Sequence, residues 1–260
     1  MVSIIAVMSS ALHVVRAGAG PSVLLLHGSA ADHSTWSIQL ASPSLTQRFS
    51  LVAYDRPADR LTVEAHAADA ATLLAEAPAR TLVVGSSFGA VIALELVRRH
   101  GARCAGAILI EPPMSATDEV TAEQRGLLAA FDQRLAEQGG PAAAELFLRT
   151  VLGDAAYERM PRAFQERSKA KWEAIRADSA ALLAYRPRYA ELAQVDVPVR
   201  LLGGERSAPY FRATLHALAA ALPDARIELL PAGHMLHAEA HRRFAEIVID
   251  LAAAVGHAPG

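Results

Sequence analysis

The chain of 260 residues contains one cysteine, Cys104, and only two lysines, Lys169 and Lys171. A single cysteine cannot form an internal disulfide, and it excludes zinc and iron–sulfur sites that are built from several cysteines. Because the cysteine content does not indicate an oxidising compartment, we expect a cytoplasmic protein.

Clusters of positive charge and long apolar runs are also missing. The net charge is −2 at pH 7 with neutral histidines, and no basic cluster is present to bind a phosphate backbone, so we expect no nucleic-acid partner. No window reaches the roughly 18 uninterrupted apolar residues of a membrane-spanning helix. The apolar start, 1–12, has no basic residue before it and is predicted to be a strand instead of a signal peptide. We expect a soluble protein without a membrane partner.

Hydrophobic residues make up 52% of the chain, in an alternation of short and long segments. Short β-branched and leucine-rich runs alternate with longer stretches at helical spacing, which is typical of a mostly parallel sheet covered by helices. The sequence therefore predicts an α/β fold with an eight-stranded sheet whose first two strands are antiparallel. The predicted strands are 4–8, 12–16, 22–26, 50–54, 81–84, 105–110, 199–202 and 226–230, and the predicted helices between later strands are 34–48, 62–77, 88–100, 210–222 and 240–255.

Residues 113–190 interrupt this alternation. They contain no convincing strand, and glycine and proline at positions such as 139–141 and 161 divide them into helical pieces. We predict a helical cap here, inserted into a core domain formed by residues 1–112 and 191–260. The cap holds half of the aromatic residues, and we expect most of them to pack its own small core while a few line an apolar pocket.

The strand predicted to end at Val84 runs into Gly85-Ser86-Ser87-Phe88-Gly89 and then into a helical stretch. A nucleophilic serine needs its hydroxyl lifted clear of the backbone at a tight strand-to-helix turn, and the two flanking glycines permit that geometry. The five-residue motif occurs by chance, but the strand before it and the helix after it favour Ser87 as a catalytic nucleophile over a plain glycine-rich turn.

A nucleophilic serine needs a base, expected in a loop after the last strand. Only one of the ten histidines, His234, follows a strand through a Pro/Gly turn into a helix. We predict His234 as the general base, with His237 as the alternative.

A third feature is an apolar strand that ends in His27-Gly28-Ser29. A tetrahedral oxyanion is stabilised by fixed N–H donors, one of which usually comes from the residue after the nucleophile, here Phe88. We predict the N–H of Ser29 as the second donor and a structural role for His27 in bracing the loop. Gly28 and, in the cap, Trp172 are predicted to contact the substrate.

In this order and spacing, these features resemble the α/β-hydrolase superfamily over nearly the whole chain. The resemblance rests on His27-Gly28, the Gly-x-Ser-x-Gly motif around Ser87, the helical cap, and Gly233-His234. It implies the α/β-hydrolase fold. It is much less specific for the substrate, since the superfamily includes esterases, lactonases, thioesterases, amidases, carbon–carbon hydrolases and non-hydrolytic members.

The sequence departs from the commoner family pattern at the triad acid. Where that pattern has an Asp in a turn after the cap, this chain has Ser207. The strand after the nucleophile ends in Glu111, and parallel strands open at the same edge of the sheet. Members that resemble haloalkane dehalogenases or zearalenone hydrolases place a Glu there, so we predict Glu111 as the triad acid, with Glu205 or a triad without an acid as alternatives. Glu111 could also simply anchor the cap.

A second departure lies at Asp55-Arg56, where many members carry a glycine-rich turn that is missing here. We interpret these two residues as a structural pair or a loop cap, although Arg56 could contact an acidic group of a substrate.

Together these residues predict a cofactor-independent and metal-independent serine hydrolase that cleaves a small to medium, largely apolar carboxylic ester or lactone through an acyl-enzyme. A thioesterase or a carbon–carbon bond hydrolase could use the same triad. The lost Asp leaves open a different class, a non-catalytic relative that binds a small molecule or a protein partner.

Overall fold

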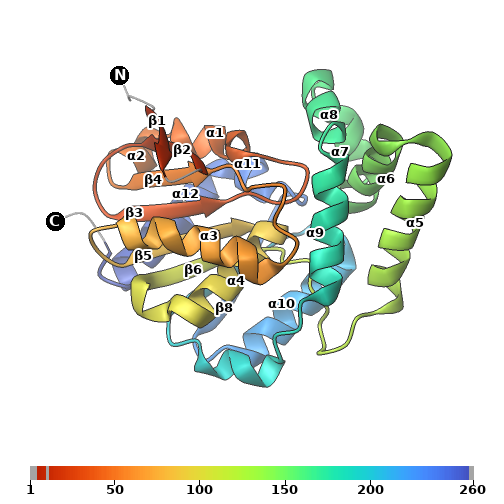
Figure 1. The fold of residues 1–260 in the computed structure, drawn as a ribbon. Coiled ribbons are helices and arrows are strands. Elements are labelled where there is room, and N and C mark those ends of the chain that lie inside the picture. The colour runs from red at the N-terminus through yellow and green to blue at the C-terminus, as the bar shows by residue number, and fades with distance from the viewer. Residues whose placement is uncertain (1–4, 10–11, 258–260) are drawn as a thin grey trace.

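The computed structural model describes residues 5–9 and 12–257, and its centre is an eight-stranded sheet (Figure 1). The strands are β1 (Ile5–Ser9), β2 (Leu12–Ala17), β3 (Ser22–Leu26), β4 (Ser50–Tyr54), β5 (Thr81–Ser86), β6 (Cys104–Ile110), β7 (Val199–Gly204) and β8 (Ala225–Leu230). Their order in the sheet is β1-β2-β4-β3-β5-β6-β7-β8. The pairs β1–β2 and β2–β4 are antiparallel, and the remaining neighbours are parallel. The predicted sheet is confirmed; positions 1–4 and 10–11 of the apolar start lie outside the described residues.

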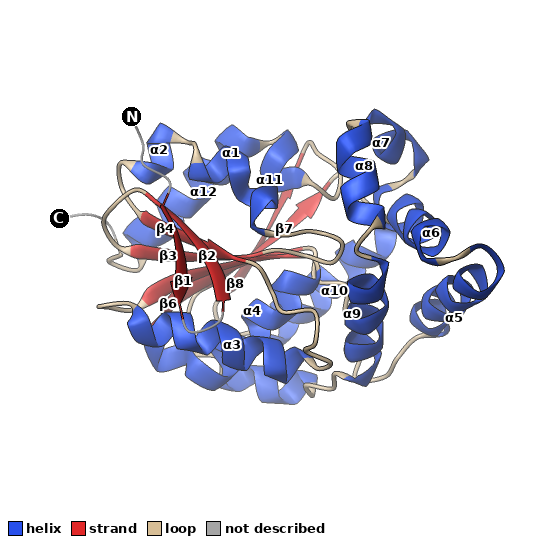
Figure 2. Cartoon of the chain, turned by 45° about the horizontal axis from the view of Figure 1, so that its top comes forward, coloured by secondary structure: helices blue, strands red, loops and turns tan. Residues whose placement is uncertain are grey.

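Helices cover both faces of the sheet, as Figure 2 shows. One face carries α3 (Val63–Glu76), α4 (Phe88–His100) and α10 (Pro209–Ala221), and the other carries α1 (Ser37–Leu40), α2 (Pro43–Thr46), α11 (Leu236–Glu239) and α12 (His241–Ala254). Two single-turn helices, η1 (His33–Trp36) and η2 (Gly101–Arg103), lie in connecting loops.

One helix prediction is wrong. The stretch 34–48, predicted as a continuous helix, forms η1, α1 and α2 instead. Pro43 has no backbone N–H to continue a helix, and it begins a new helix in which the Ser42 carbonyl accepts from Leu45 and Thr46.

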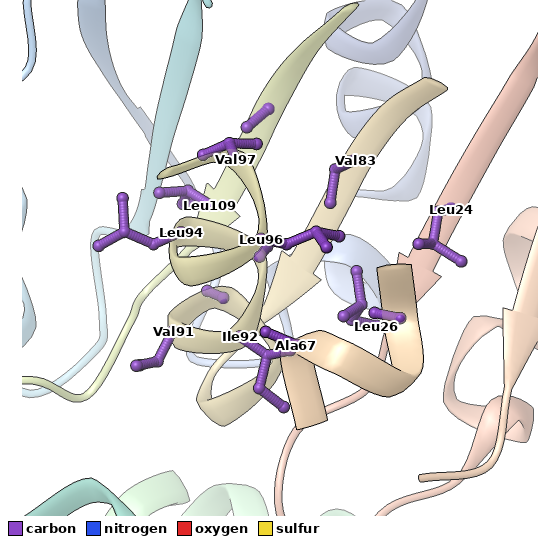
Figure 3. Packing of buried hydrophobic residues seen from close by; sticks show 14 of the residues in the cluster. Leu24, Leu26, Ala67, Val83, Val91, Ile92, Leu94, Leu96, Val97 and Leu109 are labelled. Atoms are coloured by element: carbon purple, nitrogen blue, oxygen red, sulfur yellow. The ribbon is translucent and has the colours of Figure 1, made fainter. Parts of the chain in front are cut away.

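The layer between the sheet and the helices α3, α4 and α10 is the larger part of the core. Strand β5 is buried along its whole length, which explains the apolar run Leu82-Val83-Val84 within it. Figure 3 shows side chains of α4 and the strands packed together, among them Leu24, Leu26, Val83, Val91, Ile92, Leu96 and Leu109. This packing fixes the position at which α4 leaves the carboxyl end of β5.

The segment between β6 and β7 consists of helices joined by loops and lies to one side of the sheet (Figure 1). It contains α5 (Ala122–Gln138), α6 (Gly140–Leu152), α7 (Asp154–Arg159), α8 (Arg162–Lys169), α9 (Trp172–Ala184) and η3 (Tyr189–Gln194). Phe131, Tyr157 and Ile175 form part of a small apolar core of its own. None of the helices in the described part of the chain has both the length and the apolar character needed to cross a membrane.

A buried hydrogen bond joins the end of α9 to α4. Tyr185 Oη donates to Oε2 of the fully buried Glu95 at 2.9 Å. Burial alone would raise the pKa of Glu95, but hydrogen bonds from Arg98, Arg99 and Tyr185 outweigh it and hold this pKa below its ordinary value. The carboxylate is therefore ionised at neutral pH, and it ties the helical segment to the sheet domain.

The turn from β5 into α4 lies directly against the end of β3. A Cβ added to Gly89 would lie 2.3 Å from the Leu26 carbonyl oxygen, and one added to Gly85 would lie 2.2 Å from the Gly89 oxygen. Only glycine lets these backbone segments approach so closely.

Two glycine-to-alanine variants test this close approach. Gly89→Ala should lower the free energy of unfolding by at least about 2 kcal/mol, because its methyl group overlaps backbone that cannot move aside. Gly126→Ala in α5 is the control: a Cβ there meets nothing within 4 Å, so it should raise the free energy of unfolding by about 0.5–1 kcal/mol. Urea denaturation measures both, and wild-type stability for Gly89→Ala would contradict the packing.

Candidate active site

Ser87 lies at the turn between β5 and α4 in a strained backbone conformation. Its φ is 55° and its ψ is −124°, a region that costs a non-glycine residue about 1–3 kcal/mol. Ser87 occupies the N-cap position of α4, yet its side chain makes no capping hydrogen bond. The turn therefore directs the Ser87 hydroxyl away from the helix it precedes, as the sequence pattern predicts for a nucleophile.

Glu111 and His234 form a buried pair at the same edge of the sheet. His234 Nδ1 lies 2.5 Å from Glu111 Oε2, and the Gly204 N–H donates to Glu111 Oε1 at 2.7 Å. Both side chains are buried, and the Phe211 ring stacks on His234 with centroids 4.6 Å apart. Because a carboxylate only accepts, His234 carries its proton on Nδ1 and leaves Nε2 free to act as a base.

The alternatives to these two residues are placed differently. His237 is buried between Trp36 and Phe244, and burial lowers its pKa to about 4. In the described ranges it has no carboxylate partner. Glu205 is exposed in the turn after β7. Among the described residues, the carboxylate that pairs with His234 is that of Glu111, and Glu205 forms no ion pair with it. The geometry therefore brings together His234 and Glu111, and not the alternatives His237 and Glu205.

Two backbone N–H groups flank Ser87 without an acceptor. Phe88 begins α4, so its N–H has no partner within the helix, and the N–H of Ser29 likewise has none among residues 5–9 and 12–257. A Cβ added to Gly28 would lie 3.0 Å from Ser87 Cβ, so the loop that carries Ser29 packs directly on the Ser87 turn. Two unpaired donors beside a serine hydroxyl can bind an oxyanion.

Two cavities meet at Ser87. The larger measures about 390 Å³ and extends under the helical segment; the side chains that make it largely apolar include Met114, Leu127, Leu128, Phe147, Leu182 and Leu183. The smaller measures about 80 Å³ and is lined by Gly28, Ser29, Ser87 and His234 among others. Ser29 and Ser87 line both.

Trp172 does not contact either cavity at Ser87. It packs on Gly140, where an added Cβ would lie 2.3 Å from the indole ring, and belongs to the small core of the helical segment. This position does not support its predicted contact with a substrate. Gly28, by contrast, lines the smaller cavity.

Asp55 and Arg56 do not pair with each other, but Asp55 caps a loop, the alternative in our interpretation, because it accepts the His33 backbone N–H at 2.8 Å. Asp55 accepts from His33 Nδ1 at 2.8 Å and lies 2.9 Å from His13 Nδ1. Arg56 instead forms a buried, two-pronged ion pair with Asp178 of α9, at 2.7 and 3.0 Å.

Sequence reasoning missed Asp178. The available signal was a carboxylate on the apolar face of α9, one turn from the buried residues Ile175 and Ala181. Its partner lies 122 residues away.

The residues best suited to hold a metal ion are His13, His33 and Asp55. Their potential ligand atoms lie within 4.8 Å of one another, and two imidazoles with one carboxylate suit a divalent transition metal. The three residues line neither cavity at Ser87. Their hydrogen bonds through Asp55 join β2, η1 and the end of β4, which accounts for the cluster without an ion.

Replacing the two acidic candidates tests the placement of the triad acid. Glu111→Gln should lower kcat for p-nitrophenyl butyrate by at least about 10³-fold, because an amide cannot stabilise the imidazolium of His234. Glu205→Gln should stay within about twofold of wild type, because its side chain is exposed and away from His234. Thermal melts confirm folding, and a larger loss for Glu205→Gln than for Glu111→Gln would contradict this assignment.

Several known proteins that are similar to this chain are hydrolases. Pimeloyl-[acyl-carrier protein] methyl ester esterase of Vibrio vulnificus is 29% identical over 136 residues, which cover 50% of this chain and 52% of that enzyme. The chain thus matches about half the length of this curated relative. An esterase from Thermogutta terrifontis superimposes with a TM-score of 0.76 at 22% identity over 99% of both chains. The enol-lactonase from Burkholderia xenovorans gives 0.73 at 20% identity over 94% of this chain and 98% of that one.

At these identities the two solved structures support the fold and carry no conclusion about substrates. The family comparison extends further, because the description "Alpha/beta hydrolase family" matches residues 23–247, from β3 into α12. The match includes the Ser87 turn, the helical segment and His234. The predicted α/β-hydrolase fold is confirmed, and the chain belongs to the alpha/beta hydrolase family.

Proposed function

We propose that the protein is a serine hydrolase of carboxylic esters with a medium-length apolar acyl group and a small alcohol. The observation that carries the proposal is the buried pair of His234 and Glu111 at the sheet edge where Ser87 is held with a free hydroxyl. In this proposal residues 113–190 form the cap, and residues 1–112 and 191–260 form the core domain.

The reaction follows from the position of each group. His234 Nε2 takes the proton of Ser87 as Oγ attacks the ester carbonyl carbon, and Glu111 stabilises the imidazolium that forms. The N–H groups of Ser29 and Phe88 bind the oxyanion. When the intermediate collapses, His234 gives the proton to the leaving alkoxide. Water then attacks the acyl-enzyme with His234 again as base, and Ser87 is restored.

The unequal cavities support a division between acyl and alcohol groups. His234 must protonate the alkoxide oxygen, so the alcohol lies on the side of His234, and His234 lines the smaller cavity. That cavity of about 80 Å³ has room for roughly two or three water-sized groups. The acyl chain is left with the cavity of about 390 Å³. A small free alcohol favours an open-chain ester over a lactone, whose alcohol stays attached to the acyl chain.

Two isomeric esters test this division. Methyl nonanoate and octyl acetate have the same atoms, but the long chain is on the acyl side in the first and on the alcohol side in the second. We expect kcat/KM for methyl nonanoate to exceed that for octyl acetate by at least about 10-fold, since several methylene groups are buried in one orientation and excluded in the other. A pH-stat that follows acid release measures both.

A fluorophosphonate probe controls for the nucleophile. Wild type should be labelled at Ser87, and Ser87→Ala should be neither labelled nor active. A folded wild type that resists the probe and cleaves neither ester would exclude a serine hydrolase. Preference for octyl acetate would keep the hydrolase and reverse the assignment of the cavities.

A further inference from the structure

We propose that Arg56 and Asp178 are positioning residues of the oxyanion hole, which they assemble only when helix α9 of the cap is docked. The inference rests on the proposed function, in which the Ser29 N–H binds the oxyanion. It assigns the orientation of that N–H to an ion pair between the core and the cap.

The orientation of the Ser29 N–H is set by the carbonyl of the residue before it. The Gly28–Ser29 peptide is planar, and the described chain contains no cis peptide bond, so the Ser29 N–H points opposite to the Gly28 oxygen. Two donors hold that oxygen: Arg56 Nη2 at 3.1 Å and His27 Nδ1 at 2.8 Å. Fixing the Gly28 carbonyl therefore also fixes the N–H.

Arg56 holds this loop at several points along the backbone. The Nε of its side chain donates to the His27 carbonyl at 3.3 Å, and its backbone N–H donates to the His27 ring at Nε2, at 3.1 Å. Because Nε2 accepts, the His27 proton is on Nδ1, where it donates to Gly28. Burial first, and then the charge of Arg56, lower the pKa of His27 well below its ordinary value, so the ring stays neutral in this role.

Asp178 connects this arrangement to the cap. It lies on α9, is almost fully buried, and binds both terminal nitrogens of Arg56. The same carboxylate accepts from Ser29 Oγ at 2.8 Å. With α9 undocked, Arg56 would lose its only fixed counter-ion among the described residues, and Ser29 would lose its side-chain anchor. A closed cap and a formed oxyanion hole are therefore one state of the molecule.

A pair of ketones separates positioning from general structural effects. 1,1,1-Trifluorodecan-2-one forms a bond between its carbonyl carbon and Ser87 Oγ; the carbonyl electron pair becomes an oxyanion, and the serine proton passes to His234. Decan-2-one occupies the same cavity with little addition. The ratio of the two inhibition constants therefore reports on the oxyanion hole.

We expect Arg56→Met and Asp178→Asn to raise the inhibition constant of the trifluoromethyl ketone by about 10- to 100-fold, part of the loss seen when an oxyanion donor is removed. The inhibition constant of decan-2-one should change less than threefold. For methyl nonanoate, kcat should fall while KM stays nearly constant, because the interaction forms only in the transition state.

Two further variants keep the test decisive. Removing one charge of a buried pair strongly destabilises a protein, but replacing both charged residues with apolar ones often leaves its stability unchanged. The double variant Arg56→Met/Asp178→Leu should therefore fold, and its inhibition constant for the trifluoromethyl ketone should still be raised. Tyr185→Phe is the matched control, since it removes another buried link between cap and core, to Glu95, without touching residues 27–29. Its inhibition constants should both stay within threefold of wild type.

Each outcome has one consequence. If both inhibition constants change in parallel in the folded double variant, the positioning role is wrong, while cleavage of methyl nonanoate by wild type but not by Ser87→Ala keeps the proposed function. Tyr185→Phe leaves Arg56 and Asp178 in place. If it raises the inhibition constant of the trifluoromethyl ketone as much as Asp178→Asn does, loosening of the cap accounts for the loss, and the positioning role of the pair is overturned. If wild type is neither labelled nor active, proposed function and positioning role fail together.

Discussion

The site depends on the contact between the end of β3 and the turn from β5 into α4. Gly89 lies so close to β3 that an added Cβ would be 2.3 Å from the Leu26 oxygen, and a Cβ added to Gly28, just beyond β3, would lie 3.0 Å from Ser87 Cβ. This crowding holds Ser87 at a φ of 55°. A relaxed turn would let the hydroxyl cap α4, which is what an N-cap serine ordinarily does. The strain at Ser87 is stabilised by the apolar layer between α4 and the sheet, so the free hydroxyl is a product of core packing.

The same sheet edge explains how Glu111, the proposed triad acid, can directly follow β6. Strands β6 and β7 are parallel neighbours, and the Glu111 N–H donates to the Leu202 carbonyl. Their carboxyl ends therefore lie side by side, and a carboxylate from either can reach a histidine that follows β8. Glu111 also accepts the Gly204 N–H from the turn after β7. A buried carboxylate needs such partners, and with both oxygens satisfied Glu111 leaves no role for an acid at Ser207.

Features set by local pattern could be predicted from the sequence, and features set by packing of the helical segment between β6 and β7 could not. The strands, α4 and the turn at Ser87 follow from apolar runs and glycines next to one another in the chain. The pairing of His234 with Glu111 could be predicted because each residue follows the carboxyl end of a strand in the same parallel part of the sheet. The pairing of Asp178 with Arg56 depends on how α9 packs on the core, for which no short-range rule exists. The position of Trp172 also depends on long-range packing, here on Gly140 within the helical segment.

The ion pair between Arg56 and Asp178 also solves an electrostatic problem. Asp178 lines the larger cavity and accepts from Ser29 Oγ at 2.8 Å, so its negative charge lies near the place where an oxyanion would form. In a buried site an uncompensated carboxylate there would oppose that charge strongly. Arg56 binds both of its oxygens and offsets its charge, while two further N–H groups of Arg56 hold the backbone of the loop. Loss of Arg56 alone should therefore harm the reaction more than loss of the whole pair, because only the single change leaves a bare negative charge beside the oxyanion.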